Sequence, residues 1–561
     1  MLRVMDVIKR LFPEGTRPQR GQQWKDPPFW PPDVFAIAAT LTSLSGCYSR
    51  PPFTSHCAPF CVFDKTHLEN VRRNGRTWSD GKFPREVTNL WKRLVGAGDE
   101  DVLKSDGDWC EAAIKLITIA DEASVGIGFI SEEQKEFSFA DYLFNQHLRQ
   151  QDVIKKGRRR FKLNPRFDLP NLPLTLCWMV PPSEVCVQPK ARTPQVGCTL
   201  RSLTHHLALL PPAGEIVTSW LFGVPAARST GEPLNLLLVP FPYHIDGSCF
   251  HGESDEFGDG KSRFFLLQQN WLNWQGRKLS DRQISKFLIE LVKKAENEVR
   301  TVHGVILPEC ALDDSQVNAV AKDLGRRTEL ELFVSGVFRP PQRKGFAENA
   351  VYTTLFYQQR ILTDWKQSKH HRWNLDRNQI HRYHLGDALK PTGIWWEKIE
   401  IHPRTCTFYV FRHGASLVTL VCEDLARIDP VQVALRSVGP NLVVVLLMDG
   451  PQIERRWPGR YATVLADDPG SAVLTLTCFG MVRRSIMPGD QEPAQIALWK
   501  EPGGVAQELK LPKNSHALLL TLTQSWETGY TLDGRSDREG TMRLSLSGVR
   551  GVTHNAPPKW A

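Results

Sequence analysis

The pattern of hydrophobic and polar positions divides the chain into two parts. In the first part, apolar residues recur with the three-to-four-residue spacing of amphipathic helices, and proline-rich segments separate the periodic stretches. Residues 32–46 begin with a proline suited to a first turn and end at Gly46, a common stop signal. The same spacing recurs in residues 84–98, 109–123 and 139–156. This pattern predicts a mainly helical N-terminal domain over residues 1–200, followed by a connector over residues 201–232.

In the rest of the chain, short apolar runs alternate with single amphipathic helices. The runs at residues 234–242 and 304–312 consist mostly of aliphatic residues and end at proline or polar groups, as buried strands do. Further runs of this kind lie at residues 331–340, 348–357, 416–425, 441–450 and 472–480. The alternation predicts an α/β domain over residues 233–535, with a C-terminal tail over residues 536–561.

Composition places the chain among ordinary folded proteins. Its 561 residues exceed what one hydrophobic core usually serves, which predicts two or three domains. Hydrophobic residues make up 41% and charged residues 23%, which argues against wholesale disorder. Twelve cysteines are too sparse for a disulfide scaffold, and the apolar stretch Leu442–Met448 is too short to cross a bilayer. Because the first residues lack a secretion signal, we expect a cytoplasmic protein without a membrane partner.

The net charge of the chain says little about its binding partners. The 70 basic and 61 acidic side chains leave a net charge of +9, a mild surplus that permits an anionic partner without requiring one. The densest basic run, residues 155–162, contains Arg158–Arg160 and Phe161 and is a candidate nucleic-acid patch. A solvated connector is the more common role of such a run.

Three residues that carry chemistry follow strand-like runs. Cys422 stands at a predicted strand-to-helix turn, where backbone N–H groups and a helix N-terminus favour a thiolate and hold an oxyanion. Glu309 follows another buried run, and a carboxylate there needs a cationic or hydrogen-bonding partner. Lys369 is a candidate for that partner. Taken singly, a buried structural thiol and a surface hairpin are the commoner explanations for Cys422 and Lys369.

Taken in order, three motifs resemble the carbon–nitrogen hydrolase (nitrilase) superfamily. They are LPECAL (307–312), SKHH (368–371) and VTLVCEDL (418–425), and the last is similar to the elbow of the glutamine-hydrolysing domains attached to NAD synthetases. The resemblance extends over residues 233–535. It implies an α-β-β-α sandwich that works without metal or organic cofactor. It also implies a homo-oligomer, a dimer or higher, with helical faces buried between protomers.

The resemblance implies roles for individual residues. Glu309 would be the general base, Lys369 the oxyanion stabiliser and Cys422 the nucleophile. Glu397, at 422 − 397 = 25 residues before the cysteine, would hold the lysine and the attacking water, with Glu400 as the fallback. The family's usual residues before its histidine are replaced here, so Lys366 competes with Lys369. We prefer Lys369, because His371 follows two residues later.

The resemblance also implies which residues surround the substrate. The backbone N–H of Glu423 would help to stabilise the oxyanion, while Asp449 and Trp457 stand where the family places substrate-contacting groups. Two long insertions, residues 253–274 and 374–396, suggest a narrowed pocket. Three tryptophans in or next to the second insertion are candidates to line it: Trp373, Trp395 and Trp396.

These observations predict hydrolysis of a non-peptide carbon–nitrogen bond, in a small-molecule amide or nitrile, through a cysteine thioester. A catalytically idle scaffold or regulatory module is one alternative, and a nucleic-acid-associated effector recruited by the N-terminal half is another. Acyl transfer uses the same elbow and is not separated from hydrolysis. Cys57 and Cys61, near His56 and Cys47, are poorly spaced for zinc, and we expect no metal site.

Overall fold

The computed structural model describes most of the chain. The described residues are 1–16, 23–49, 66–104, 107–129, 171–172, 174–222, 231–253, 262–342, 345–412, 415–486, 494–537 and 540–561. Several features singled out in the sequence lie outside these ranges: the predicted helix at 139–156, the basic run at 155–162, and His56, Cys57 and Cys61.

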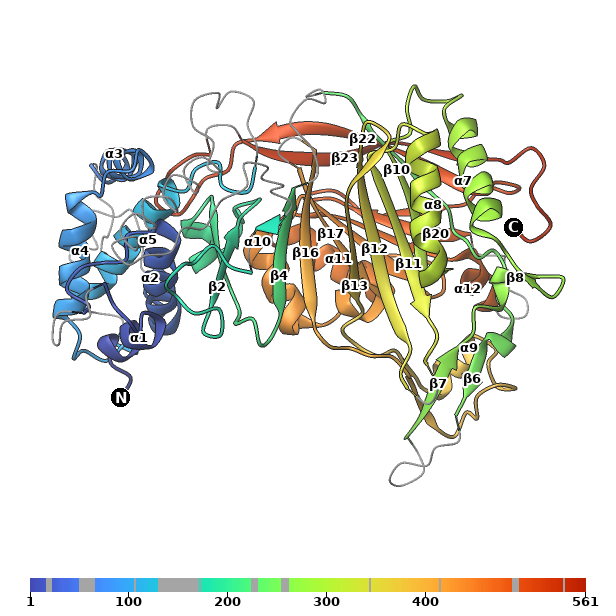
Figure 1. Cartoon of the computed structure of the whole chain (residues 1–561), viewed down its shortest axis with the longest axis horizontal. Helices are drawn as coiled ribbons and strands as arrows, with labels where there is room; N and C mark the ends of the chain where they lie inside the picture. Colours follow the sequence, from blue (N-terminus) through green and yellow to red (C-terminus); the bar gives the residue numbers. More distant parts are fainter. Residues whose placement is uncertain are drawn as a thin grey trace, which may run out of the picture.

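Helices gather at the N-terminal end of the molecule (Figure 1). They are α1 (Val4–Leu11), α2 (Pro31–Ser45), α3 (His67–Ser79), α4 (Arg85–Gly96) and α5 (Asp108–Glu122). Helices α2 and α5 pack against each other and are buried along most of their length, so they form the centre of the group. The helix predicted for residues 32–46 is confirmed, and Gly46 ends it with a φ of +69°.

Strands begin earlier than the sequence pattern predicted. Short strands occupy β1 (Asn171–Leu172), β2 (Cys186–Pro189), β3 (Leu207–Leu210) and β4 (Val217–Phe222). The described part of residues 171–200 therefore contains no α-helix. Residues 217–222 pair with β16 (Thr405–Arg412) in a large sheet instead of forming a connector. Prolines in this region interrupt helical periodicity without preventing short strands.

Two sheets stack face to face in the α/β region. The eight-stranded sheet has the order β1-β4-β16-β17-β18-β19-β20-β21, and the seven-stranded sheet has the order β13-β12-β11-β10-β5-β22-β23. Central neighbours in both sheets are parallel, namely β17-β18-β19 and β5-β10-β11. Contacts of β10 with β18 and of β12 with β17 join the two sheets. Strands buried on both faces explain the unbroken apolar runs of the sequence.

The other strands of the eight-stranded sheet are β17 (Ala415–Val421), β18 (Leu442–Leu447), β19 (Ala472–Thr477), β20 (Gln495–Lys500) and β21 (Gln507–Lys510). Those of the seven-stranded sheet are β5 (Leu234–Leu238), β10 (Gly304–Asp313), β11 (Leu332–Arg339), β12 (Glu348–Tyr357), β13 (Arg360–Ser368), β22 (Ala517–Glu527) and β23 (Thr541–Val552).

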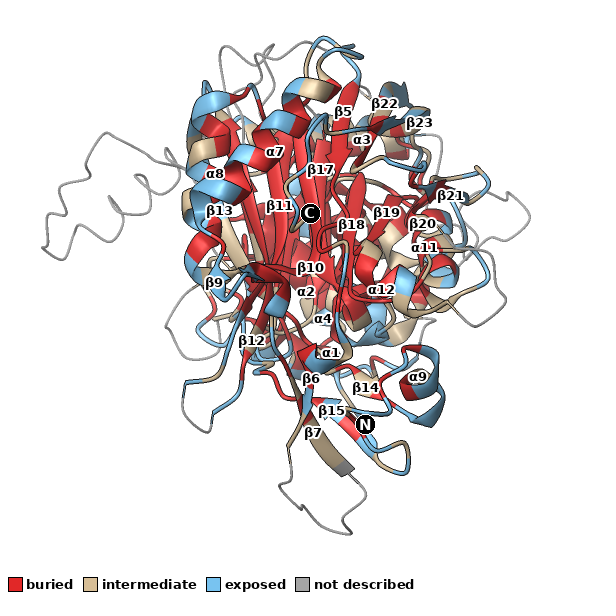
Figure 2. Cartoon of the chain, turned by 90° about the vertical axis from the view of Figure 1, so that its right-hand side faces the viewer, coloured by how far each residue is buried: buried red, intermediate tan, exposed pale blue. Residues whose placement is uncertain are grey.

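Helices cover both outer faces of this pair of sheets. Helices α7 (Asp281–Ala295) and α8 (Asp314–Arg327) pack together, and α8 lies against β11 and β13. On the other side α11 (Trp457–Asp467) lies against β19 and β20. Figure 2 shows the buried strands between these two helical layers. The layers therefore run helix, sheet, sheet, helix.

The C-terminal segment differs from its prediction. The tail expected over residues 536–561 instead contains β23, which pairs along its length with β22 in the seven-stranded sheet. Met542 and Leu544 alternate with more exposed neighbours and point into the core. This half-buried alternation is typical of an edge strand, and it is weaker than the continuous apolar runs of the central strands.

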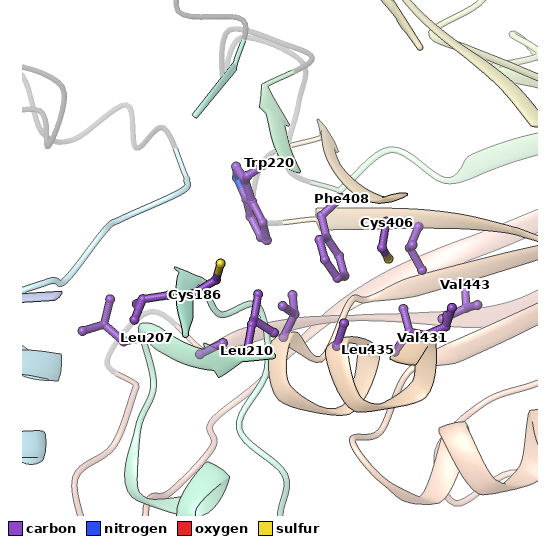
Figure 3. Packing of buried hydrophobic residues seen from close by; sticks show 14 of the residues in the cluster. Cys186, Leu207, Leu210, Trp220, Cys406, Phe408, Val431, Leu435 and Val443 are labelled. Carbon is purple, nitrogen blue, oxygen red and sulfur yellow. The ribbon is translucent and has the colours of Figure 1, made fainter. Parts of the chain in front are cut away.

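One hydrophobic cluster links the N-terminal helices to the stacked sheets. It runs from α2 and α5 through the β2–β3 hairpin and into the space between the sheets. Figure 3 shows Leu210 of β3 beside Leu435 of the short helix α10 (Val433–Val438), with Trp220 facing Phe408. The two parts predicted as separate domains thus share a core.

A buried network of charges strengthens this connection. The Arg535 guanidinium lies 2.9 Å from Asp121 Oδ2 of α5 and 2.9 Å from Asp533 Oδ2. His67 Nε2 of α3 lies 2.9 Å from the same Asp533 oxygen. All four side chains are buried, so the loop between β22 and β23 holds the N-terminal helices through fully desolvated ion pairs.

The two long insertions combine into one small sheet. Its order is β14-β15-β7-β6, made from β6 (Phe250–Gly252), β7 (Ser262–Leu267), β14 (Asn374–Leu375) and β15 (Ile394–Glu397). Strand β7 of the first insertion pairs in parallel with β15 of the second. We call these four strands the cap sheet. Together with α9 (Arg377–Arg382), it lies at one end of the stacked sheets (Figure 1).

Candidate active site

Cys422 occupies a strained position at the end of β17. Its φ is +47°, in a region that residues with a Cβ rarely adopt, and a short 3-10 turn, Cys422–Leu425, follows it. Only 2% of the residue is exposed. Burial, followed by the negative charge of Glu309, raises the pKa of the Cys422 thiol well above its usual value, while Lys369 opposes the shift. The group is therefore a neutral thiol, and not the thiolate that the sequence pattern predicted, because burial and the nearby carboxylates disfavour the charged form.

Glu309 lies within β10 at an irregularity of the strand. The sequence placed it at a strand end, but β10 continues to Asp313 after its register with β11 shifts between Leu307 and Leu312. Gly336 on β11 makes this possible, because a Cβ there would lie 2.4 Å from the Glu309 Cα. Such a bulge directs the Glu309 side chain to its partners. Burial, and to a lesser degree the charge of Glu397, raises the pKa of Glu309.

Lys369 lies between two carboxylates. It directly follows β13, and its Nζ is 2.9 Å from Glu309 Oε1 and 2.7 Å from Glu397 Oε2. The side chain is completely buried. Burial favours the neutral amine, but the charges of Glu309 and Glu397 outweigh it and hold the pKa of Lys369 well above its usual range. The group is therefore an ammonium ion.

The structure separates the two candidate lysines. Lys366 Nζ pairs with Asp314 and Glu348, each at 3.1 Å, and its side chain remains 31% exposed. It lies in a different ion pair from Lys369, so the structure brings Lys369 and not Lys366 to Glu309.

Glu397 reaches the cluster from the cap sheet. Its Oε2 also accepts the backbone N–H of Trp373 at 3.0 Å. Glu400 is exposed, and its carboxylate accepts the nearby backbone N–H of Ile401. The structure thus brings Glu397, and not the fallback Glu400, to the lysine.

Asn349 on β12 joins the two glutamates and was missed by the sequence analysis. Its Nδ2 donates to Glu309 Oε1 and to Glu397 Oε1, both at 2.8 Å. The signal that the sequence offers is weak: one amide side chain near the start of the strand-like run at residues 348–357.

Asp424 ties the lysine loop to the cysteine turn. This buried carboxylate accepts the backbone N–H of His370 and lies 3.0 Å from His371 Nδ1. His370 Nε2 in turn accepts the backbone N–H of Thr405 at 3.1 Å. Burial lowers the pKa of His370, which suits a neutral acceptor. Asp424 therefore fixes the segment after Lys369 relative to Cys422.

Asp449, which follows β18, has one oxygen with three donors and one without a partner. Its Oδ1 accepts from Arg456 Nη2 at 2.7 Å, from the Gly450 backbone N–H at 2.8 Å and from the Tyr383 hydroxyl. Its Oδ2 is buried and has no hydrogen-bond partner. The charge of Asp449 contributes to the raised pKa of the Cys422 thiol. Sequence analysis missed Tyr383 and Arg456.

The remaining predicted residues lie less centrally. The Glu423 carboxylate pairs with Arg427 at 2.9 Å. Trp457 is half-buried at the first position of α11, next to Arg456. Trp396 is 39% exposed, because strand alternation directs it away from the face of β15 that carries Trp395 and Glu397. The structure does not bring Trp396 to the cluster.

The candidate active site consists of amino-acid side chains of the described residues. Among them, no set of three or more histidine, cysteine, aspartate or glutamate side chains is arranged to hold a metal ion. None of their helices is long and apolar enough to cross a membrane. The cluster itself combines a neutral thiol, a carboxylate with a free oxygen and a buried ammonium, which together can support nucleophilic attack, proton transfer and anion stabilisation.

Several solved structures are similar to about half of this chain. The glutamine-dependent NAD+ synthetase from Acinetobacter baumannii is 12% identical over 52% of this chain and 45% of its own, with a TM-score of 0.31. An amidase from Nesterenkonia sp. is 13% identical over 53% of this chain and 91% of its own, with a TM-score of 0.32. Nit3 from Saccharomyces cerevisiae, a member of the nitrilase superfamily, is 10% identical over 56% of this chain and 90% of its own, with a TM-score of 0.28.

The chain thus has a weak structural similarity to nitrilase superfamily members, and it spans less than half the length of the synthetase. No protein-family model matches the sequence, and no curated protein matches it. Similarity of this size says nothing about activity, which rests on the geometry of the cluster.

Proposed function

We propose that the chain hydrolyses a carbon–nitrogen bond other than a peptide bond, in a small-molecule amide or nitrile, through a covalent intermediate on Cys422. The observation that carries this proposal is the Lys369 ammonium held between Glu309 and Glu397, in the electrostatic surroundings of the Cys422 thiol. An ammonium and a base beside a buried thiol are what acyl transfer to sulfur requires.

In this reaction Glu309 accepts the thiol proton. Its Oε1 is occupied by Lys369 and Asn349, whereas its Oε2 is buried without a partner. The raised pKa values of both Glu309 and Cys422 favour proton transfer during attack rather than a standing thiolate.

The sulfur then attacks the substrate carbon, and Lys369 stabilises the negative charge that develops on the oxygen. Glu309 then gives its proton to the departing nitrogen. The carbon–nitrogen bond breaks, ammonia or an amine leaves, and the acyl group remains on Cys422 as a thioester. Water, deprotonated by Glu309, hydrolyses the thioester and releases the carboxylic acid. A nitrile would give a thioimidate first, and a first water would release ammonia from it.

Asp449 supplies the proposed recognition of the substrate. Arg456 neutralises its charge, while its buried Oδ2 remains free to accept a hydrogen bond. A neutral N–H or O–H donor on the substrate fits this oxygen better than a full cation does. We place Trp457 beside this contact because it follows Arg456 at the start of α11.

Released ammonia tests the proposal. Purified protein is incubated with glutamine, asparagine and simple amides and nitriles, and Cys422→Ala is compared with Cys478→Ala, another buried cysteine. We expect turnover of at least one compound that Cys422→Ala abolishes and Cys478→Ala retains. Turnover that survives in Cys422→Ala contradicts the proposal, and no turnover across the panel favours the idle scaffold. Adding hydroxylamine distinguishes transfer, which gives a hydroxamate, from hydrolysis.

A further inference from the structure

Asn349 contacts Glu309, Glu397 and the backbone of Lys369. Its Nδ2 donates one proton to Glu309 Oε1 and the other to Glu397 Oε1, both over 2.8 Å. Its backbone carbonyl accepts the Lys369 N–H at 2.8 Å. The residue is 1% exposed, so water does not replace these contacts.

The orientation of the amide follows from its partners. Two carboxylate oxygens require two donors, which only the amide nitrogen supplies. The Oδ1 atom has no hydrogen-bond partner, so the amide makes its side-chain contacts as a donor alone. An uncompensated buried carbonyl has a cost, which the two charge-assisted hydrogen bonds offset.

The charge balance explains why such a donor is needed. Two carboxylates face a single ammonium, so the cluster carries an excess negative charge. Lys369 is the cation that forms ion pairs with both glutamates, at 2.9 Å from Glu309 Oε1 and 2.7 Å from Glu397 Oε2. The hydrogen bond from the Asn349 amide to Glu309 adds to the stabilisation of the ionised form of that carboxylate and opposes the rise in its pKa that burial causes.

We propose that Asn349 is a positioning residue of the reaction, whose amide holds Glu309 and Glu397 on either side of the lysine and keeps Glu309 in the ionised form that accepts the thiol proton. The inference rests on the proposed role of Glu309 as the base. It assigns to β12 a part in catalysis beyond its place in the sheet.

The pH dependence of Cys422 alkylation by iodoacetamide, mapped by mass spectrometry, tests this role without a substrate. Alkylation of the wild-type protein should rise with pH as Glu309 ionises. Asn349→Leu removes both donors at similar volume, which disfavours the carboxylate and moves this rise to higher pH by about one unit. Asn349→Asp, which keeps the shape but supplies no donor when ionised, should shift it in the same direction. Turnover, where a substrate is found, should show the same shift in kcat/KM.

Asn441→Leu is the matched control. Asn441 is similarly buried and contacts Ser416 and the Met542 carbonyl instead of the two glutamates. The Asn441→Leu variant should be less stable than the wild-type protein, but the pH dependence of its Cys422 alkylation should not shift. A folded Asn349→Leu protein with the wild-type profile overturns the inference. If that variant does not fold, an unshifted profile in Asn349→Asp overturns it. A wild-type Cys422 that is inert at every pH rejects the proposed function, and this inference with it.

Discussion

Lys369 Nζ lies 2.7 Å from Glu397 Oε2, and this contact joins the stacked sheets to the cap sheet. Lys369 follows β13 of the seven-stranded sheet, whereas Glu397 belongs to β15, which pairs with β7 of the other insertion. The insertions therefore do more than border the site: they deliver one of the two carboxylates that hold the lysine.

Loss of the lysine should abolish most of the activity. Lys369→Met removes the ammonium that stabilises the oxyanion, so kcat should fall by about 100-fold or more. Lys366→Met is the control, because that lysine forms a partly exposed pair with Asp314 and Glu348 and should leave kcat within about twofold. Ammonia release measures both. A larger loss of kcat in Lys366→Met than in Lys369→Met would contradict the assignment of oxyanion stabilisation to Lys369.

Tyr383 should affect substrate binding more than thiol reactivity. Tyr383→Phe removes the hydroxyl that donates to Asp449 Oδ1 and leaves the ring in place. We expect KM to rise by about 3- to 10-fold, the effect of losing one typical hydrogen bond, with Cys422 alkylation unchanged. Tyr409→Phe, at another fully buried tyrosine, should change neither. Equal KM values in the wild-type protein and Tyr383→Phe would remove Tyr383 from substrate recognition.

The network around Arg535 should stabilise the whole chain. Arg535→Met leaves Asp121 and Asp533 buried without their cation, and the free energy of unfolding should fall by about 3–5 kcal/mol. Arg550→Met breaks an exposed pair with Glu298 and should cost less than about 1 kcal/mol. Urea unfolding followed by fluorescence compares them. Similar midpoints for the two variants would contradict a stabilising role of this network.

Acid should remove the contribution of the same network. The Arg535 charge holds the pKa values of Asp121 and Asp533 below their usual range despite burial. Because the folded-state pKa values are lower than those of the unfolded chain, the stabilisation is complete above about pH 4 and is lost as the pH falls further. The difference in unfolding free energy between the wild-type protein and Arg535→Met should therefore shrink from pH 5 to pH 3. A difference that stays constant over this range would contradict the assignment.

The order of strands and helices could be predicted because strands buried on both faces leave continuous apolar runs, as in residues 304–312. The cysteine at 422 could be singled out because it follows such a run, and the lysine at 369 because it stands with the cysteine in an order of motifs that resembles a known family. Strand β23 could not be predicted, because a half-buried edge strand shows only a weak alternation of apolar and polar residues.

Contacts that depend on tertiary pairing were beyond the sequence. The parallel pairing of β7 with β15 joins segments far apart in the chain, and neither segment carries a signal for the other. Asn349 and Tyr383 are single polar residues whose partners, the carboxylates of Glu309, Glu397 and Asp449, lie on other elements of the fold. The shared core also escaped prediction, because apolar periodicity shows that a face is buried but not what buries it.

Mass spectrometry of the acid-quenched protein tests the central claim most directly. The protein is mixed with the amide it hydrolyses fastest, stopped during turnover and digested. The account predicts an added mass equal to the acyl group on the peptide that contains Cys422, absent in Cys422→Ala. Turnover without that adduct, or an adduct on Cys310 or Cys478 instead, would contradict it.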